Sequence, residues 1–280
     1  MKERVITFGD EKSLVGILAE PGEADEIRDA PCVLILNSGI LHHVGPFRLH
    51  VDAARHLAAH GYRVLRFDVA GIGDSLSARG ADYDEDRVIA DVRTAMDELE
   101  NKKGIHDFVL MGLCTGAANS HKAAIADDRV KGGIFLDGYA YPTWRFYMRR
   151  YLPAACDPVR IRNTLSITAR RLLGKTEKED DFSGASEDFG WWRLPPKDEI
   201  RKDLAKFVDR GVDLLYVHSG DQCEVYNYRD QFADAFSSLD FKGKLKVIIN
   251  DEADHTYVMS VDRDRLINQL TAWLNDCYSS

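Results

Sequence analysis

Short apolar runs recur along the chain and alternate with segments that have helical spacing. The runs cover residues 32–37, 62–68, 107–112, 132–138, 213–218 and 245–250. Because consecutive residues in each run are apolar, both of its faces must be covered, which is typical of central strands in a parallel sheet. Segments 47–60, 88–100 and 261–278 instead space their apolar residues three and four apart, which indicates helices. The alternation predicts an α/β fold, in which right-handed βαβ units build a mostly parallel central sheet with helices on both faces.

Two segments depart from this alternation. Runs 4–8 and 13–20 flank a Gly-Asp turn, which predicts an antiparallel hairpin at the start of the chain. Between about Tyr139 and Lys197 the sequence is aromatic and irregular, and it is too long for an ordinary connection, so we expect an inserted cap or lid. The expected organisation is a core of residues 1–138 and 198–280 with a cap of residues 139–197, which suits a length of 280 residues.

Charge and composition narrow the function classes. A net charge of -9 and a pI near 5.5 argue against a general nucleic-acid or membrane-surface binder. No apolar stretch reaches the roughly 18 residues of a membrane span, and the polar N-terminus lacks a signal-peptide core, so we expect a cytoplasmic protein. The cysteines occur singly, without a CxxC pair or a histidine-rich partner cluster, which is a poor pattern for zinc and, in a reducing compartment, for disulfides. We expect no metal and no bound cofactor.

One cysteine has neighbours that suggest chemistry. Cys114 lies in Gly112-Leu113-Cys114-Thr115-Gly116, directly after an apolar run and before a helical pattern. This is G-x-C-x-G in the strand–turn–helix setting of a nucleophile elbow, where side chains at the flanking glycine positions would collide with the neighbouring strand and helix. The start of a helix also favours a negative charge on the sulfur. The alternative is a tight strand–helix turn that carries an inert cysteine.

Four segments in chain order carry a family resemblance. They are LNSGILHHVGPFRLHV (36–51), GYRVLRFDVAGIGDS (61–75), GLCTGA (112–117) and EADHTY (252–257). With them the chain resembles the α/β-hydrolase superfamily over nearly its whole length. Within that superfamily it is most similar to the serine-aminopeptidase-like hydrolases and to the hydrolases associated with exosortase systems. The resemblance implies an α/β-hydrolase fold and a catalytic triad whose members follow the chain order nucleophile, acid, histidine.

The resemblance implies positions for the other two triad members. His255 follows the last apolar run and precedes the final helix, where these enzymes carry the base, although a surface-loop histidine is the alternative. The acid should follow run 213–218, and Asp221 is the first choice. Many relatives place the acid one or two residues further on, so Glu224 is the alternative acid. Either carboxylate would hold the imidazole tautomer and stabilise the imidazolium.

Residues around the reacting group are also expected from the resemblance. The backbone N–H of Thr115 and that of Ile40 should form the oxyanion hole, since relatives carry His-Gly-x where this chain has Asn37-Ser38-Gly39. Segment 68–75 is expected to have a structural role at the rim. The expected substrate-binding residues are Gly39, Leu41, His42, His43, Tyr139 and Trp144.

A cysteine at the elbow widens the possible chemistry. A thiolate needs less help from a base than an alcohol does and accepts acyl groups from thioesters at little thermodynamic cost. Ester or lactone hydrolysis, thioester hydrolysis and acyl transfer all remain open. Dienelactone hydrolases and polyhydroxyalkanoate synthases resemble the chain in using a cysteine elbow, within the core fold.

The expected cap adds a clue to the substrate. Between Thr143 and Lys175 there are seven arginines and one lysine against one acid, Asp157. Such a basic insert could meet the phosphates of coenzyme A or an acyl-carrier protein, the alternative being a solvated helical face.

We therefore expect a hydrolase or acyltransferase that acts on an ester or thioester of a small acyl substrate. A carrier-dependent acyltransferase or condensing enzyme of polysaccharide or secondary-metabolite biosynthesis is one alternative, and a non-catalytic binding protein is the other. The acyl group, the acceptor and the oligomeric state stay open.

Overall fold

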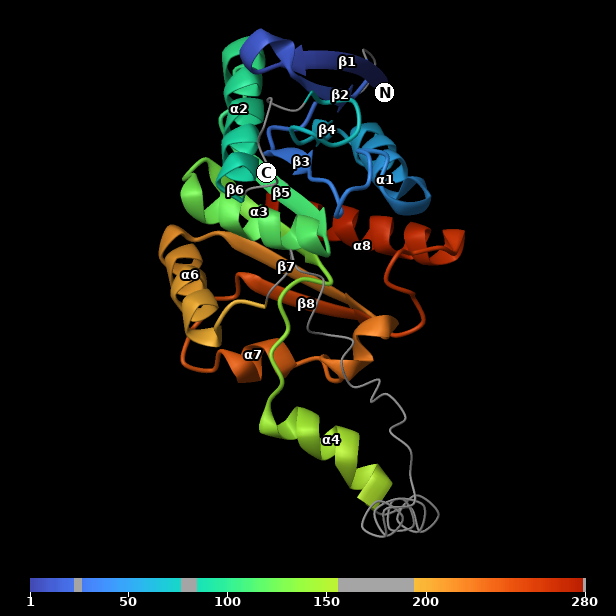
Figure 1. The fold of residues 1–280 in the computed structure, drawn as a ribbon, viewed down its shortest axis with the longest axis vertical. Helices are drawn as coiled ribbons and strands as arrows, with labels where there is room; N and C mark the ends of the chain where they lie inside the picture. The colour runs from blue at the N-terminus through green and yellow to red at the C-terminus, as the bar shows by residue number, and fades with distance from the viewer. Residues whose placement is uncertain (23–26, 77–84, 156–193, 279–280) are drawn as a thin grey trace, which may run out of the picture.

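A single sheet organises the part of the chain that the computed structural model describes, residues 1–22, 27–76, 85–155 and 194–278. Eight strands lie in the order β1-β2-β4-β3-β5-β6-β7-β8 (Figure 1). Their bounds are β1 Lys2–Phe8, β2 Leu14–Glu20, β3 Cys32–Ile35, β4 Val64–Asp68, β5 Phe108–Leu113, β6 Val130–Leu136, β7 Asp213–Ser219 and β8 Leu245–Asn250. The predicted hairpin pairs β1 with β2 antiparallel, and the strands from β3 to β8 are parallel. The predicted fold class is confirmed.

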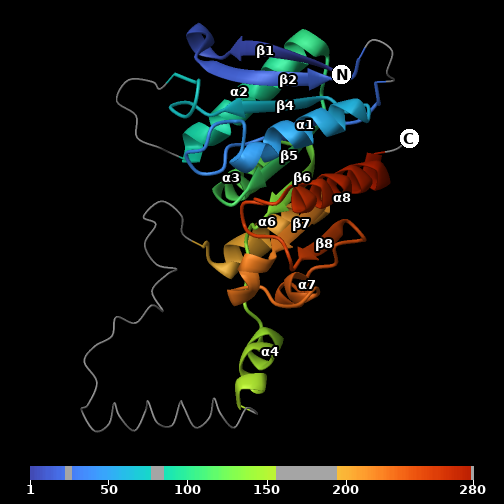
Figure 2. The ribbon, with the colours of Figure 1, turned by 90° about the vertical axis from the view of Figure 1, so that its right-hand side faces the viewer.

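Helices cover both faces of this sheet, as Figure 2 shows from the side. The long helices of the described residues are α1 Leu49–Ala59, α2 Glu85–Lys103, α3 Thr115–Ala126, α4 Trp144–Ala155, α6 Lys197–Arg210 and α8 Ser260–Tyr278. Leu57 of α1 and Trp273 of α8 pack in the core on one face. Met96 of α2 and Phe207 of α6 pack in the core on the other. Strands buried on both sides explain why their sequences are apolar at consecutive positions.

The first helix begins later than the apolar spacing predicts. The expected segment 47–60 starts as a short 3-10 turn, η2 Pro46–Arg48, and α1 begins only at Leu49. Phe47 and Arg48 have positive φ angles of 45° and 69°, which a helix does not tolerate. The turn carries the chain out of the loop after β3 and then into α1.

The order of the strands creates a topological switch point at their carboxyl ends. From β3 the chain crosses to β4 on one side, and from β4 it returns to β5 on the other side of β3. The connections after β3 and β5 lead to helices on opposite faces of the sheet, and parallel α/β sheets bind ligands at such a switch point. The G-x-C-x-G turn and segment 37–43 meet there.

The region predicted as a cap is described in part. Helix α4 follows β6 and extends beyond the short helix α7 (Gln231–Ala235) in both views (Figures 1 and 2). Residues 156–193 lie outside the described residues, with the predicted basic positions Arg160, Arg162, Arg170, Arg171 and Lys175. The division into core and cap stays a prediction. Within the described ranges, no helix combines the length and the apolar character that crossing a membrane requires.

Candidate active site

Cys114 occupies a strained turn between β5 and α3. Its φ of 58° and ψ of -120° are unusual for a residue with a side chain, and backbone strain of this kind clusters at functional sites. A Cβ on Gly112 would lie 2.1 Å from the backbone of Gly116, and a Cβ on Gly116 would lie 2.5 Å from the carbonyl oxygen of Asn37. Both glycines are therefore required for α3 to approach β5 and the loop after β3. The turn leaves Cys114 half-buried rather than enclosed.

His255 lies between Cys114 and a buried carboxylate. Its Nδ1 is 2.7 Å from Oδ2 of Asp137, and its ring also hydrogen-bonds with the Cys114 thiol. The bond to Asp137 and then the bond to Cys114 raise the pKa of His255 to about 10, although burial acts in the opposite direction. The imidazole is therefore protonated at neutral pH. Such a cation beside a sulfur and a carboxylate is the arrangement of a Cys-His-acid triad.

The carboxylate at this ring is neither of the two predicted from the sequence. Asp221 lies in η4 (Gly220–Glu224), and its Oδ2 accepts the backbone N–H of His255 at 2.8 Å instead of facing the ring. The side chain of Glu224 is 78% exposed and lies near Arg150. Asp137 follows β6 directly, is 4% exposed, and has a φ of 47° that turns it out of the strand. The geometry favours Asp137 as the acid over Asp221 and Glu224.

A signal for Asp137 was present in the sequence. It is the next-to-last residue of the run 132–138, at the edge of the sheet where the carboxyl ends of all the parallel strands meet. An aspartate at the end of a strand that is otherwise apolar is a candidate for function in this class of fold. The resemblance to known hydrolases directed the choice to the next strand instead.

The loop after β3 is tied to the first turn of α3. The N–H of Gly39 donates to Oγ1 of Thr115 at 2.6 Å. As the first residue of α3, Thr115 has an N–H that helix geometry leaves without an intrahelical partner. Ile40 follows Gly39 in the same loop, with a side chain that is exposed together with that of Leu41. Both expected oxyanion donors thus belong to segments that meet beside Cys114, and their role stays a prediction.

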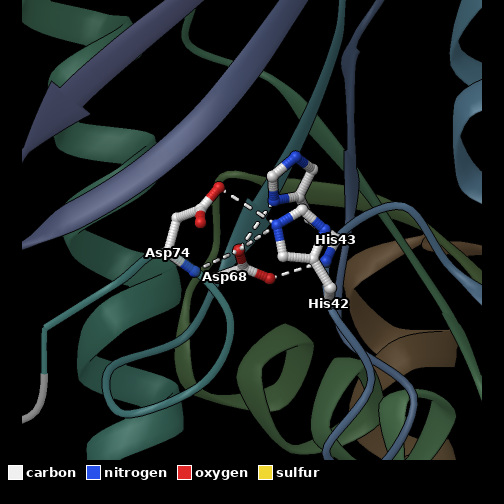
Figure 3. A group of neighbouring side chains, drawn as sticks. All are labelled: His42, His43, Asp68 and Asp74. Atoms are coloured by element: carbon white, nitrogen blue, oxygen red, sulfur yellow. Dashed lines mark hydrogen bonds and ion pairs between the residues drawn. The ribbon is translucent and has the colours of Figure 1, made fainter.

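Behind this loop lies a network of two histidines and two aspartates (Figure 3). Nδ1 of His43 lies 2.7 Å from Oδ2 of Asp68, and Nε2 of His42 lies 3.0 Å from Oδ2 of Asp74. Asp68 also accepts the N–H of His43 at 2.6 Å. Burial alone would raise the pKa of Asp68, but hydrogen bonds from His43, Asp74 and Asn37 outweigh it and hold the pKa below the ordinary value. These hydrogen bonds therefore hold the loop after β3 against the end of β4 and the turn that follows it.

The same four side chains offer a donor set that resembles a metal site. Their candidate ligand atoms all lie within 4.8 Å of one another. However, the N–H of Val44 donates to Nδ1 of His42 at 3.3 Å, so the ring proton belongs on Nε2, which faces Asp74. If Nε2 bound a metal, Nδ1 would have to carry the ring proton, and it could then not accept the N–H of Val44. The hydrogen bonds favour a structural network, which agrees with the role expected for segment 68–75.

The two aromatic residues expected to bind substrate lie apart from each other. Tyr139 is 2% exposed and packs in the core, with its ring centroid 5.2 Å from that of His121. Trp144 is 70% exposed and lies on α4, where it lines a shallow apolar hollow with Tyr147 and Tyr151. Tyr139 therefore contributes packing, whereas Trp144 is available to a ligand.

Comparisons with known proteins agree with this architecture. Residues 33–269 match the sequence model of the α/β-hydrolase family. Among solved structures, Est1E from Butyrivibrio proteoclasticus is 18% identical, with a TM-score of 0.58 and 99% of each chain covered. An alpha-beta serine hydrolase homologue from Coxiella burnetii is 16% identical, with a TM-score of 0.58 and 97% of each chain covered. A meta-cleavage product hydrolase from Pseudomonas fluorescens is 15% identical, with a TM-score of 0.58 and 98% of each chain covered. At such identities the likeness shows a shared fold alone, and no curated protein matches the chain in sequence.

Proposed function

The chain belongs to the α/β-hydrolase family, and we propose that it is a hydrolase or acyltransferase whose Cys114 accepts an acyl group from an ester or thioester. In this proposal His255 transfers the proton and Asp137 orients the imidazole. The observation that carries it is the continuous contact from the Cys114 thiol through the His255 ring to the Asp137 carboxylate. Removal of any member of such a triad should impair the same chemical step.

The first half of the reaction consumes the donor. With the proton on His255, the Cys114 thiolate attacks the carbonyl carbon, and a C–S bond forms as the carbonyl electrons move to oxygen. The N–H groups of Thr115 and Ile40 would stabilise that oxyanion, and one such donor contributes about 3 kcal/mol in comparable enzymes. Collapse of the intermediate breaks the bond to the leaving alcohol or thiol, which takes the proton from His255. Asp137 stabilises the imidazolium throughout and keeps its own charge.

The second half decides between the two activities. Neutral His255 takes a proton from water or from an alcohol or amine acceptor as that molecule attacks the carbonyl carbon of the acyl-Cys114 thioester. The tetrahedral intermediate then collapses, the C–S bond breaks, and Cys114 leaves as a thiolate beside the protonated His255. Water gives hydrolysis, and an acceptor gives acyl transfer. The exposed aromatic face of α4 at Trp144 and Tyr151 suits an apolar acyl group or acceptor.

The nature of the acyl donor is proposed from the sequence alone. The described arginines of α4 have protein partners: Arg145 forms an ion pair with Asp234 at 2.8 Å, and Arg150 donates to the carbonyl oxygen of Glu224 at 2.7 Å. These contacts support the attachment of α4 to the core more than they support phosphate binding. A donor linked to coenzyme A or to an acyl-carrier protein, and a place in polysaccharide or secondary-metabolite biosynthesis, stay predictions.

A cytoplasmic location is also proposed. Four of the five cysteines are free thiols within the described part of the chain, Cys32, Cys114, Cys223 and Cys277. Free thiols and a cysteine nucleophile are suited to a reducing compartment. Fractionation of the native host cell would test this assignment.

Intact-mass measurement tests the proposed chemistry. The protein is mixed with an activated acyl ester or an acyl thioester, and peptide mapping locates the added mass. We expect one acyl group on Cys114, absent from Cys114→Ala and unchanged in Cys223→Ala, whose cysteine is exposed in η4. A protein that alkylates readily at Cys114 and never acylates would favour the binding-module alternative. Adding amines and alcohols to the acylated sample, and following product partition, separates hydrolysis from transfer.

A further inference from the structure

The end of β7 contacts the acid of the proposed triad. Ser219, 2% exposed, donates its N–H to Oδ1 of Asp137 and its hydroxyl to Oδ2, both at 2.7 Å. Oδ2 also faces Nδ1 of His255, so the serine hydroxyl and the imidazole share one oxygen. Ser219 thereby fixes the plane of the carboxylate as well as its distance from the ring.

The next two residues hold the histidine loop. The N–H of Gly220 donates to the carbonyl oxygen of Ala253 at 2.8 Å. A Cβ at Gly220 would lie 2.1 Å from the carbonyl oxygen of Asp251, so only glycine allows this approach. Asp221 then accepts the backbone N–H of His255 at 2.8 Å. Three consecutive residues therefore contact the acid and the main chain of the loop that carries the histidine.

We propose that Ser219-Gly220-Asp221 is a positioning clamp for the Asp137–His255 pair, with Ser219 orienting the carboxylate and Asp221 orienting the main chain of His255. This inference rests on the proposed function, because it assigns residues that act through the triad. It also gives a role to the carboxylate that occupies the usual acid segment. Asp221 acts on the histidine through its backbone N–H, while the acid at the imidazole comes from the neighbouring strand.

Among residues 1–22, 27–76, 85–155 and 194–278, few titratable groups lie around the pair, which simplifies the interpretation of its titration. Cys114 faces it from the β5–α3 turn, and Asp221 of η4 accepts the backbone N–H of His255. His218 of β7 and Tyr257 of the β8–α8 loop lie nearby. Burial lowers the pKa of His218 to about 4 and raises the pKa of Tyr257. Both are uncharged in the neutral range. A change there in the pH profile of Cys114 reactivity therefore reports on Cys114 and His255 and on the carboxylates of Asp137 and Asp221.

Alkylation of Cys114 tests the clamp without any acyl substrate. The rate of iodoacetamide modification is followed by peptide mass spectrometry across pH in the wild type and in variants. Asp221→Ala should displace the pH profile of alkylation by about one unit to higher pH, toward the profile of His255→Ala. The rate near pH 6 should then be roughly tenfold lower, since one pKa unit is a tenfold change in ionised fraction. Asp221→Asn, whose amide oxygen can still accept the N–H, should restore the wild-type profile. Glu224→Ala, in the same η4 but facing away, should leave it unchanged.

Ser219 and the backbone amide provide independent checks. Ser219→Ala should also shift the profile, because Oδ2 of Asp137 loses its second donor. In the unmodified protein, hydrogen exchange at the amide of His255 should be slow for a loop position. Three results would overturn the clamp. They are a wild-type profile in both Asp221→Ala and Ser219→Ala, an Asp221→Asn variant as impaired as Asp221→Ala, and rapid exchange at the amide of His255. If His255→Ala left the alkylation profile unchanged, the proposed triad itself would be wrong. If Cys114 is acylated but the Asp221 variants have no effect, only the clamp would be wrong.

Discussion

His255 and Asp137 are 118 residues apart in sequence, yet Nδ1 of one lies 2.7 Å from Oδ2 of the other. The contact crosses the end of β7, because Asp137 directly follows β6 and His255 follows β8, with β7 between them. It depends on the positive φ of Asp137 and on Ser219 of β7, which donates to both carboxylate oxygens. An acid at the end of β6 therefore reaches a histidine two strands away.

Replacing Asp137 by Asn should impair acylation of Cys114 severely. The amide keeps the shape but removes the charge that stabilises the imidazolium, and equivalent changes in serine triads cost about 10⁴ in rate. Because a thiolate needs less assistance, we expect a loss of about 10² to 10³ here. Single-turnover acylation followed by intact mass measures it. Asp221→Asn is the matched control and should stay within a few-fold of the wild type, and the reverse ranking would return the acid role to Asp221.

The protonation of His255 should make stability depend on pH in a defined window. The folded pKa is about 10, above the value of 6.5 for an unperturbed histidine. A raised pKa stabilises the fold fully below the unfolded value, and the contribution is lost as pH rises through the folded value. The difference in Tm between the wild type and His255→Gln should therefore be largest below pH 6.5 and shrink toward pH 10. A constant difference across that range would show that the pKa is not raised.

The elbow glycines should be intolerant of even a methyl group. In Gly112→Ala the new Cβ would lie 2.1 Å from the backbone of Gly116, so strand and helix must separate. Such overpacking costs about 3 kcal/mol. Gly104→Ala is the control, because its φ of 65° is strained but nothing lies within 4 Å, and we expect about 1 kcal/mol. Urea unfolding compares the two, and an equal midpoint would argue that β5 and α3 are less closely packed than the structure has them.

Parts of this molecule follow from sequence because they are determined locally. Runs such as 107–112 are apolar at successive positions because both faces of the strand are buried, and Gly112 and Gly116 mark the close approach of α3. The choice of acid is determined by tertiary geometry instead. Asp137 and Asp221 both follow buried strands at the same edge of the sheet, and nothing local says which one meets the imidazole. The turn at Asp137 and the donors of Ser219 decide it, and both depend on the pairing of β6 with β7.

Loss of the Asp68 carboxylate should affect both stability and catalysis. Asp68 is fully buried and accepts bonds from the ring and main chain of His43 and from Nδ2 of Asn37, all on the loop that carries the expected donor Ile40. Asp68→Asn places a donor where one of these bonds needs an acceptor, and breaking a buried charged network costs about 3 kcal/mol or more. The expected result is a lower unfolding free energy in urea and a slower acylation of Cys114 in the protein that remains folded.

A histidine on the same network provides the comparison for Asp68. His42 pairs with Asp74 where both side chains are partly exposed, so His42→Gln should cost less than about 1 kcal/mol and leave the loop in place. If both variants acylate at the wild-type rate, the loop after β3 does not supply an oxyanion donor. If His42→Gln is the more damaging change, its imidazole acts on the substrate directly, because its small structural contribution could not account for the loss.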